Sequence, residues 1–146
     1  MKKLTLTTLI FISSLQIVSA NQETWIDTLF SDSSRISYRK EDVDSSFLRQ
    51  VTHEEKIELS QMTNPGQKFN ATDVVVKGLP RKRLILIAQN KKYRLISYEQ
   101  GGRANHIVVL VYEQEKIRAA YQLSAIPIPK NATDLKKLVQ AKNSDK

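Results

Sequence analysis

The sequence predicts an α+β domain with an antiparallel four- to five-stranded meander over about residues 74–124. N-terminal helices are expected to pack on one face of the sheet, followed by a short C-terminal helix. Four segments of this region are short, apolar and rich in β-branched and aromatic residues, which is typical of strands. The polar breaks between them are too short for a crossover helix, so consecutive strands should pair antiparallel. These segments are 84–88, 93–98, 107–112 and 117–123.

The first twenty residues have the pattern of a cleaved export signal. Lys2 and Lys3 precede a mostly apolar, uncharged stretch over residues 4–18, and Val18-Ser19-Ala20 offers small residues to a signal peptidase. We expect cleavage after Ala20 and a bacterial protein located in the periplasm or secreted. An uncleaved anchor is the lesser alternative, because a membrane span needs about twenty predominantly apolar residues and this stretch contains several Thr and Ser. No later segment approaches a transmembrane span.

The expected mature chain, residues 21–146, has the length of a single globular α+β domain. The absence of Cys excludes disulfides, thiol chemistry and Cys-ligated metals. Two Asn-Ala-Thr triplets, at Asn70 and Asn131, match the acceptor pattern for glycosylation, which matters only in a eukaryotic source. In a bacterium we expect these residues to serve loop and helix-cap chemistry instead.

Two helices are expected before the meander. Trp25, Ile26, Leu29 and Phe30 share one face of a helix that Asn21 can cap, with Trp25 as a core residue. The polar stretch 31–46 is interpreted as loop with one short strand near residues 36–39.

The second helix is expected to begin at a capping box. Thr52 and Glu55 have the spacing of that motif, and the helix should run to about Met62 before Asn64-Pro65-Gly66 ends it. His53 would lie in the first turn as a surface residue.

The pattern of the meander also predicts which strands are central. Residues 84–88 and 107–111 are apolar on both sides and should be central or covered by helices, whereas 117–123 alternates and should be a partly solvated edge strand. Residues 69–76 are a candidate further strand, ended by Gly78-Leu79-Pro80. A closing helix capped near Asn131 or Thr133 should pack Leu135, Leu138 and Val139 inward.

Charge is divided unevenly along the expected mature chain. Residues 21–60 contain nine acidic and five basic residues, whereas residues 61–146 contain sixteen basic and six acidic residues. A basic surface attracts anionic partners through long-range electrostatics. We therefore expect the partner to be an acidic protein or an anionic envelope component, with Arg81 and Lys82 among the residues that contact it.

The loop after the second strand of the meander adds further candidates for this partner-binding surface. Gly101 and Gly102 can turn backbone amides toward an anion, Arg103 adds a planar cation, and His106 adds a ring that titrates near neutral pH. These four residues, with Arg81 and Lys82, form the predicted partner-binding site. The favoured function is a small, exported, non-catalytic binding protein of the kind that inhibits, or gives immunity to, a cell-wall-targeting or other envelope enzyme.

The alternative is a small periplasmic hydrolase or lyase with a site at Glu99 and His106. The two residues stand at the mouths of one predicted hairpin, where a base and its orienting group could face each other, with Tyr98 or Tyr121 nearby. The sequence contains no nucleophile-elbow, phosphate-loop or dinucleotide motif, and no set of metal-ligating residues. We therefore expect no cofactor and no metal. Export also argues against nucleic acid as the partner, although the net charge and the tyrosines would suit it. The oligomeric state stays open.

Overall fold

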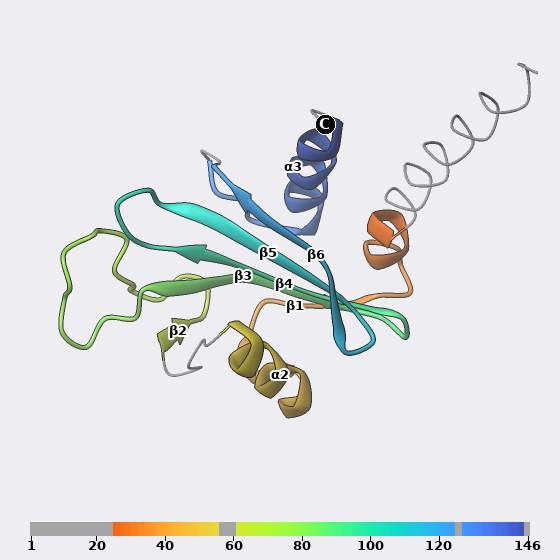
Figure 1. Cartoon of the computed structure of the whole chain (residues 1–146), viewed down its shortest axis with the longest axis horizontal. Helices are drawn as coiled ribbons and strands as arrows, with labels where there is room; N and C mark the ends of the chain where they lie inside the picture. Colours follow the sequence, from red (N-terminus) through yellow and green to blue (C-terminus); the bar gives the residue numbers. More distant parts are fainter. Residues whose placement is uncertain (1–24, 56–60, 125–126, 145–146) are drawn as a thin grey trace, which may run out of the picture.

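The computed structural model describes residues 25–55, 61–124 and 127–144. Figure 1 shows a twisted sheet with helical segments on both of its faces. Residues 25–29 form a short helical segment before the first strand. The other elements are β1 (Arg35–Ser37), the 3-10 turn η1 (Lys40–Asp42), α2 (Ser45–Glu55), β2 (Met62–Thr63), β3 (Lys82–Gln89), β4 (Tyr93–Gln100), β5 (His106–Glu113), β6 (Lys116–Leu123) and α3 (Ala132–Ser144).

The four predicted strands of the meander are confirmed as β3, β4, β5 and β6. They pair antiparallel in sequence order, and β1 pairs antiparallel with the outer edge of β3. The short strand β2 lies parallel beside the start of β3, a pairing that the sequence pattern did not predict. The α+β class is thus confirmed, with a sheet that extends beyond the meander.

The predicted roles of the strands within the sheet are also confirmed. Strands β3, β4 and β5 lie inside the sheet and are buried on both faces. Strand β6 lies at the edge, and buried and exposed residues alternate along its second half. Ile117 is the exception to the predicted alternation, because 43% of it is exposed. The register shifts at Tyr112, which pairs with Ile117 while Val111 pairs with Ala119, so Arg118 is an extra residue in β6.

The sheet separates two apolar cores. One contains Trp25, Ile26 and Leu29 of the first helical segment and Leu135 and Val139 of α3, and the other lies under α2. The prediction that the N-terminal helices share one face is therefore wrong: segment 25–29 and α2 cover opposite faces (Figure 1). The physical reason is that the interior strands are apolar on both sides, so each face needs a cover.

The second helix begins earlier than predicted. α2 begins at Ser45, and Asp44 caps it by accepting hydrogen bonds from the Ser46 amide and hydroxyl at 2.9 and 2.5 Å. The predicted cap residue Thr52 lies inside the helix, where its hydroxyl donates to the Leu48 carbonyl, and His53 lies in the last turn. The later part of the predicted helix, residues 56–60, lies outside the described residues, and Met62 belongs to β2.

Residues 69–76 form no strand, which corrects the prediction of a fifth strand there. They belong to a long loop that connects β2 to β3, and Val74, Val75 and Val76 are exposed to solvent. The start of β3 already has β2 as its neighbour on that edge, so no free strand edge is left at that point for the valines. The predicted turn follows as expected, with Leu79 N donating to Val76 O and Gly78 at a φ of +80°.

The closing helix is confirmed, and at 13 residues it is longer than predicted. Asn131 caps it by accepting a hydrogen bond from Asp134 N at 2.9 Å, and Leu135 and Val139 are fully buried. The described part of the chain contains no helix that is long and apolar enough to span a membrane. The predicted signal and its cleavage point lie at residues 1–20, outside the described residues, and stay predictions.

Candidate binding surface at the basic end of the sheet

The residues predicted to bind a partner lie at one end of the sheet, where β3 begins and β4 ends. The β4–β5 loop packs there against the β2–β3 loop, as seen at the left of Figure 1. Gly101 N donates to Arg81 O at 2.8 Å, and Gly102 N donates to Ala71 O at 3.2 Å. Two segments about twenty to thirty residues apart in the sequence thus form one surface.

The two glycines have a different role from the predicted one. Because both amides already donate to backbone carbonyls, neither is available to hold an anion. A Cβ atom on Gly101 would lie 1.9 Å from the carbonyl oxygen of Asn70, so only glycine lets the two loops approach this closely. Gly102 has a φ of +147°, a value that other residues rarely adopt.

Asn70 is the residue that holds the β2–β3 loop in shape. Its side chain is buried, its Nδ2 donates to Val74 O, and its Oδ1 accepts from the amide and the hydroxyl of Thr72 at 3.0 and 2.8 Å. Its own amide donates to Pro80 O at 2.7 Å. The expectation that both Asn-Ala-Thr triplets serve loop and cap chemistry is confirmed for Asn70 and for Asn131, which caps α3.

The cations of this end differ in how firmly they are held. The Arg103 side chain is 95% exposed, and its Nε lies 4.0 Å from a carboxylate oxygen of Asp73. Arg81 donates through Nη2 to Thr72 O at 3.5 Å, while its Nε is buried without a hydrogen-bond partner. The ammonium of Lys82 lies 5.9 Å from the centre of the Tyr98 ring.

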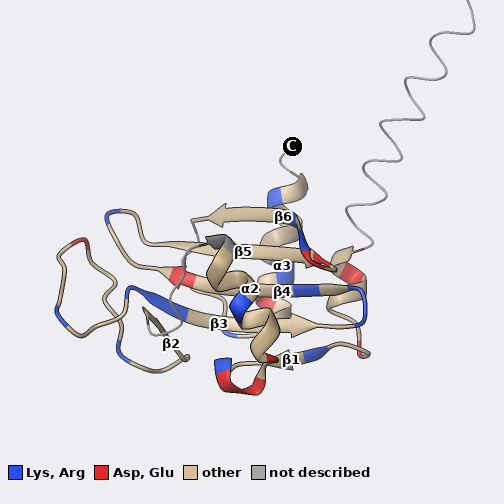
Figure 2. Cartoon of the chain, turned by 60° about the horizontal axis from the view of Figure 1, so that its bottom comes forward, with Lys and Arg blue, Asp and Glu red and all other residues tan. Residues whose placement is uncertain are grey.

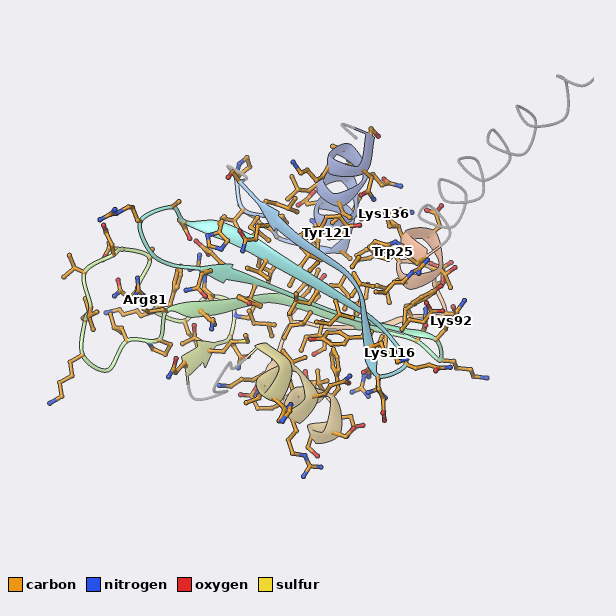
Figure 3. All side chains as sticks on the ribbon, viewed as in Figure 1. Trp25, Arg81, Lys92, Lys116, Tyr121 and Lys136 are labelled. Carbon is orange, nitrogen blue, oxygen red and sulfur yellow. The ribbon has the colours of Figure 1, made fainter. Side chains whose placement is uncertain are left out.

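Basic residues clearly outnumber acidic residues at this end. Residues 64–83 and 98–107 contain six basic and two acidic residues, and Figure 2 shows Lys and Arg along the two loops and the start of β3. Figure 3 shows Arg81 at the base of this end, far from the labelled Lys92 and Lys116 at the opposite end of the sheet. The local field therefore favours an anionic partner.

Glu99 is a structural anion inside this basic end. It is only 2% exposed, and its Oε2 accepts from Arg83 Nη2 and Nε at 2.6 and 3.1 Å. Its Oε1 accepts from Asn105 Nδ2 at 2.6 Å, and the Arg83 guanidinium also lies 4.2 Å from the centre of the Phe69 ring. The network ties both loops to the sheet and leaves the carboxylate without access to a substrate.

The structure does not bring Glu99 and His106 together. In the register of β4 and β5, Glu99 lies opposite Ile107 and Gln100 lies opposite His106, so the two side chains extend from opposite faces of the sheet. The His106 Nδ1 is 2.7 Å from Ala104 O. No group of side chains suited to hold a metal occurs among residues 25–55, 61–124 and 127–144.

Two surface grooves of about 360 and 410 Å³ lie beside segment 127–130. The smaller also contacts Tyr38, Pro65 and the start of β3, and the larger contacts α3. The described residues that line them are mostly apolar, and Asp134 is the single carboxylate among these. A histidine or second carboxylate that could form an acid–base pair with Asp134 is not among these described lining residues.

Sequence reasoning gave no role to Phe69 and Asn105, which help to build this end, and it gave Asn70 only a general role in loop structure. The signal for its detailed role was present, because Asn side chains in turns commonly accept a hydrogen bond from the backbone two residues further along, as Asn70 does from Thr72. Phe69 and Asn105 are loop residues whose partners, Arg83 and Glu99, lie on β3 and β4, and no local sequence pattern indicates these contacts. Comparison with models of protein families, with curated proteins and with solved structures finds no match to the chain.

Proposed function

We propose that this chain is an exported, non-catalytic binding protein that presents its basic end to an acidic protein of the cell envelope. The observation that carries the proposal is the arrangement of charge at this end. Arg103 is exposed and weakly paired, whereas the buried carboxylate of Glu99 is fully used by Arg83 and Asn105. Arg103 can therefore bind an anionic partner. The carboxylate of Glu99, which belongs to the alternative hydrolase or lyase site, instead stabilises the basic end of the fold.

The contact between the two loops makes the basic end suitable for tight binding. Gly101 and Gly102 fasten the β4–β5 loop to the β2–β3 loop, and Asn70 fixes the second of these from within. Binding to a loop that is already ordered avoids much of the entropy cost of association. An inhibitor or immunity protein depends on such preorganisation.

Arg103 is the residue best placed to recognise an acidic cleft. Its guanidinium can form two parallel hydrogen bonds to one carboxylate, and such charge-assisted bonds are roughly twice as strong as neutral ones. Glycosidases that cleave cell-wall polysaccharides mostly use a pair of carboxylates that flank the bond to be cleaved. We therefore propose an enzyme of this class as the target, with Lys82 and His106 as flanking contacts.

The Glu99–His106 hydrolase or lyase is less well supported. It would require the two side chains on one face of the sheet, and Glu99 would have to leave its pairing with Arg83. No observation on the described residues favours this rearrangement.

Inhibition assays with Arg103→Ala test the proposal. Wild-type protein and the variant would be titrated against a panel of cell-wall hydrolases, with the clearing of a peptidoglycan suspension as the readout. We expect inhibition of at least one enzyme, and a loss of about 10- to 100-fold in its inhibition constant on Arg103→Ala, since truncation of an interfacial charge costs about 2 kcal/mol or more.

The matched control is Arg35→Ala, which removes an exposed arginine of β1 at the opposite end of the sheet. This variant should inhibit as the wild type does. The absence of inhibition across the panel, or equal inhibition by Arg103→Ala and wild type, would contradict the proposal.

A further inference from the structure

Three adjacent valines form an exposed apolar tip on the β2–β3 loop. Val74, Val75 and Val76 are 69, 78 and 42% exposed. In the described ranges only Tyr38 and Ile117 are other large apolar residues with comparable exposure, and each stands alone. Figures 1 and 2 both show this loop extending outward from the end of the sheet. A contiguous apolar cluster on a projecting loop indicates an interaction site more strongly than scattered exposed residues do.

The valine tip is held outward by the backbone beneath it. The side chain of Asn70 donates to the carbonyl of Val74, and Leu79 N donates to the carbonyl of Val76 at 3.2 Å. The base of the loop is fastened to the β4–β5 loop through Gly102. Because the loop is fixed on both sides of the tip, the valines cannot simply fold back onto the protein surface.

Cations surround the valine tip. Lys77 follows it directly, Arg81 stands at the base of the loop, and Arg103 reaches toward it from the neighbouring loop. Asp73 is the one acidic residue of the β2–β3 loop, and Arg103 lies 4.0 Å from its carboxylate. The three valines therefore form an apolar end of the loop, and the residues between this end and the sheet are mainly positively charged.

We propose that the valine tip inserts into the interface of an anionic phospholipid bilayer, while the cations behind it bind the headgroup phosphates. The proposal goes beyond the envelope-enzyme target of the preceding section and does not depend on it. Membrane binding of this kind combines burial of apolar area with attraction of Lys and Arg to acidic lipids.

Two features favour a lipid surface over a protein partner for the tip. The tip contains no aromatic residue, whereas protein interfaces are usually anchored by Trp, Tyr or Arg in a pocket. The three adjacent valine side chains form no directional contacts such as hydrogen bonds, and insertion into a fluid hydrocarbon layer requires none.

Vesicle binding with tip variants tests the proposal. Vesicles of phosphatidylcholine alone, or with 30% phosphatidylglycerol, would be sedimented with wild type, with a Val74→Ser/Val75→Ser variant and with Lys77→Gln. We expect binding to the anionic vesicles that weakens with salt, a loss of at least ten-fold in the partition coefficient for the serine variant, and about a five-fold loss for Lys77→Gln. The controls Ile117→Ser and Lys116→Gln at the opposite end should bind as wild type does.

Insertion itself is measured with a tryptophan at the tip. Val75→Trp should show quenching by brominated lipids in anionic vesicles, and Ile117→Trp should not. Any contribution of residues 1–24 is common to all variants, so the difference between tip and control variants reports on the tip alone. Circular dichroism and the melting temperature would verify that each variant is folded.

Three results would overturn the proposal. The first is no binding to anionic vesicles, and the second is binding that the serine variant retains in full, which would indicate adsorption through charge alone. The third is a serine variant that binds vesicles as the wild type does but no longer inhibits an envelope enzyme. That result would show that the valine tip contacts a protein partner. Failure of vesicle binding leaves the Arg103 inhibition assay unaffected, so the two proposals are tested separately.

Discussion

At the residue scale, one buried carboxylate determines the shape of the basic end. Glu99 accepts hydrogen bonds from Arg83 and Asn105, and Arg83 in turn stacks on Phe69. Among the buried residues of the described part of the chain, Glu99 is the only charged one. A buried ion pair adds little net stability, but removal of one partner leaves the other charge uncompensated.

We therefore expect Glu99→Gln to destabilise the fold. The substitution keeps the shape of the side chain but removes the charge opposite Arg83, and we expect a loss of about 2–3 kcal/mol in the free energy of unfolding, since Arg83 is partly solvated. Urea denaturation measures the loss. Gln100→Glu, one residue along β4 and half-buried, is a comparison that leaves the pair intact. An unchanged midpoint for Glu99→Gln would contradict the structural role of this carboxylate.

The composition of the candidate site was predictable from the sequence, but the contacts within it were not. The charge pattern pointed to Arg81, Lys82 and Arg103, and the structure brings them to one end of the sheet. The sequence indicates an anion site at Gly101-Gly102, because nothing in the local sequence supplies acceptors for the two amides. Their acceptors, the carbonyls of Arg81 and Ala71, lie in another loop, and no local pattern could indicate them.

At the element scale, the strands were more predictable than the helices. Each strand from β3 to β6 is a short apolar segment with polar residues at its ends. Its strand propensity and its burial therefore predict the same element. α2 was placed too late because Thr52 and Glu55 matched a capping box, whereas Asp44 and the buried face of Phe47, Leu48 and Val51 define the helix. Residues 69–76 have strand propensity without a strand edge to join, so tertiary context overrides it.

The cap of α2 offers a pH-dependent prediction. Hydrogen bonds from the Ser46 hydroxyl and amide lower the pKa of Asp44 below its ordinary value of 3.8. A carboxyl whose pKa is lower in the folded state stabilises the fold above the unfolded pKa, and this contribution is lost as the pH falls through the folded pKa. Asp44→Asn retains the capping ability and should flatten the stability profile on its acid side, as the pH falls below the ordinary pKa of 3.8.

Asp44→Ala removes the cap itself. We expect it to lower the melting temperature at pH 7 by about 3–5 °C, whereas Asp44→Asn should change it by less than about 2 °C. Thermal melts followed by circular dichroism between pH 2 and 7 measure both effects. Equal melting temperatures for Asp44→Ala and wild type at neutral pH would show that another group caps the helix.

At the scale of the whole molecule, the sheet is shared by the two cores. Strands β3, β4 and β5 contribute side chains to both faces, so the loss of packing on one face is transmitted to the other. Phe47 of α2 packs edge-on against Tyr112 on one side, and Trp25 lies near Tyr121 on the other. This arrangement is expected to unfold as one cooperative unit.

Cavity-forming substitutions on each face test this cooperativity. Leu135→Ala in α3 and Phe47→Ala in α2 should each cost about 3–4 kcal/mol, because both side chains are fully buried. Each variant should still melt in a single transition, with the same midpoint by far-UV circular dichroism and by tryptophan fluorescence. Separate transitions for the two probes would show that the faces fold independently.

The edge strand β6 also limits how copies of this chain can meet. Its first residues, Lys116 to Arg118, are exposed, and the extra residue at Arg118 interrupts the regular hydrogen-bond ladder with β5. Another copy that approaches edge to edge would meet an exposed lysine, Lys116, and an irregular backbone, two devices by which sheet proteins avoid polymerising through their margins. A concentrated solution of the folded chain should therefore resist the growth of cross-β fibrils from this side.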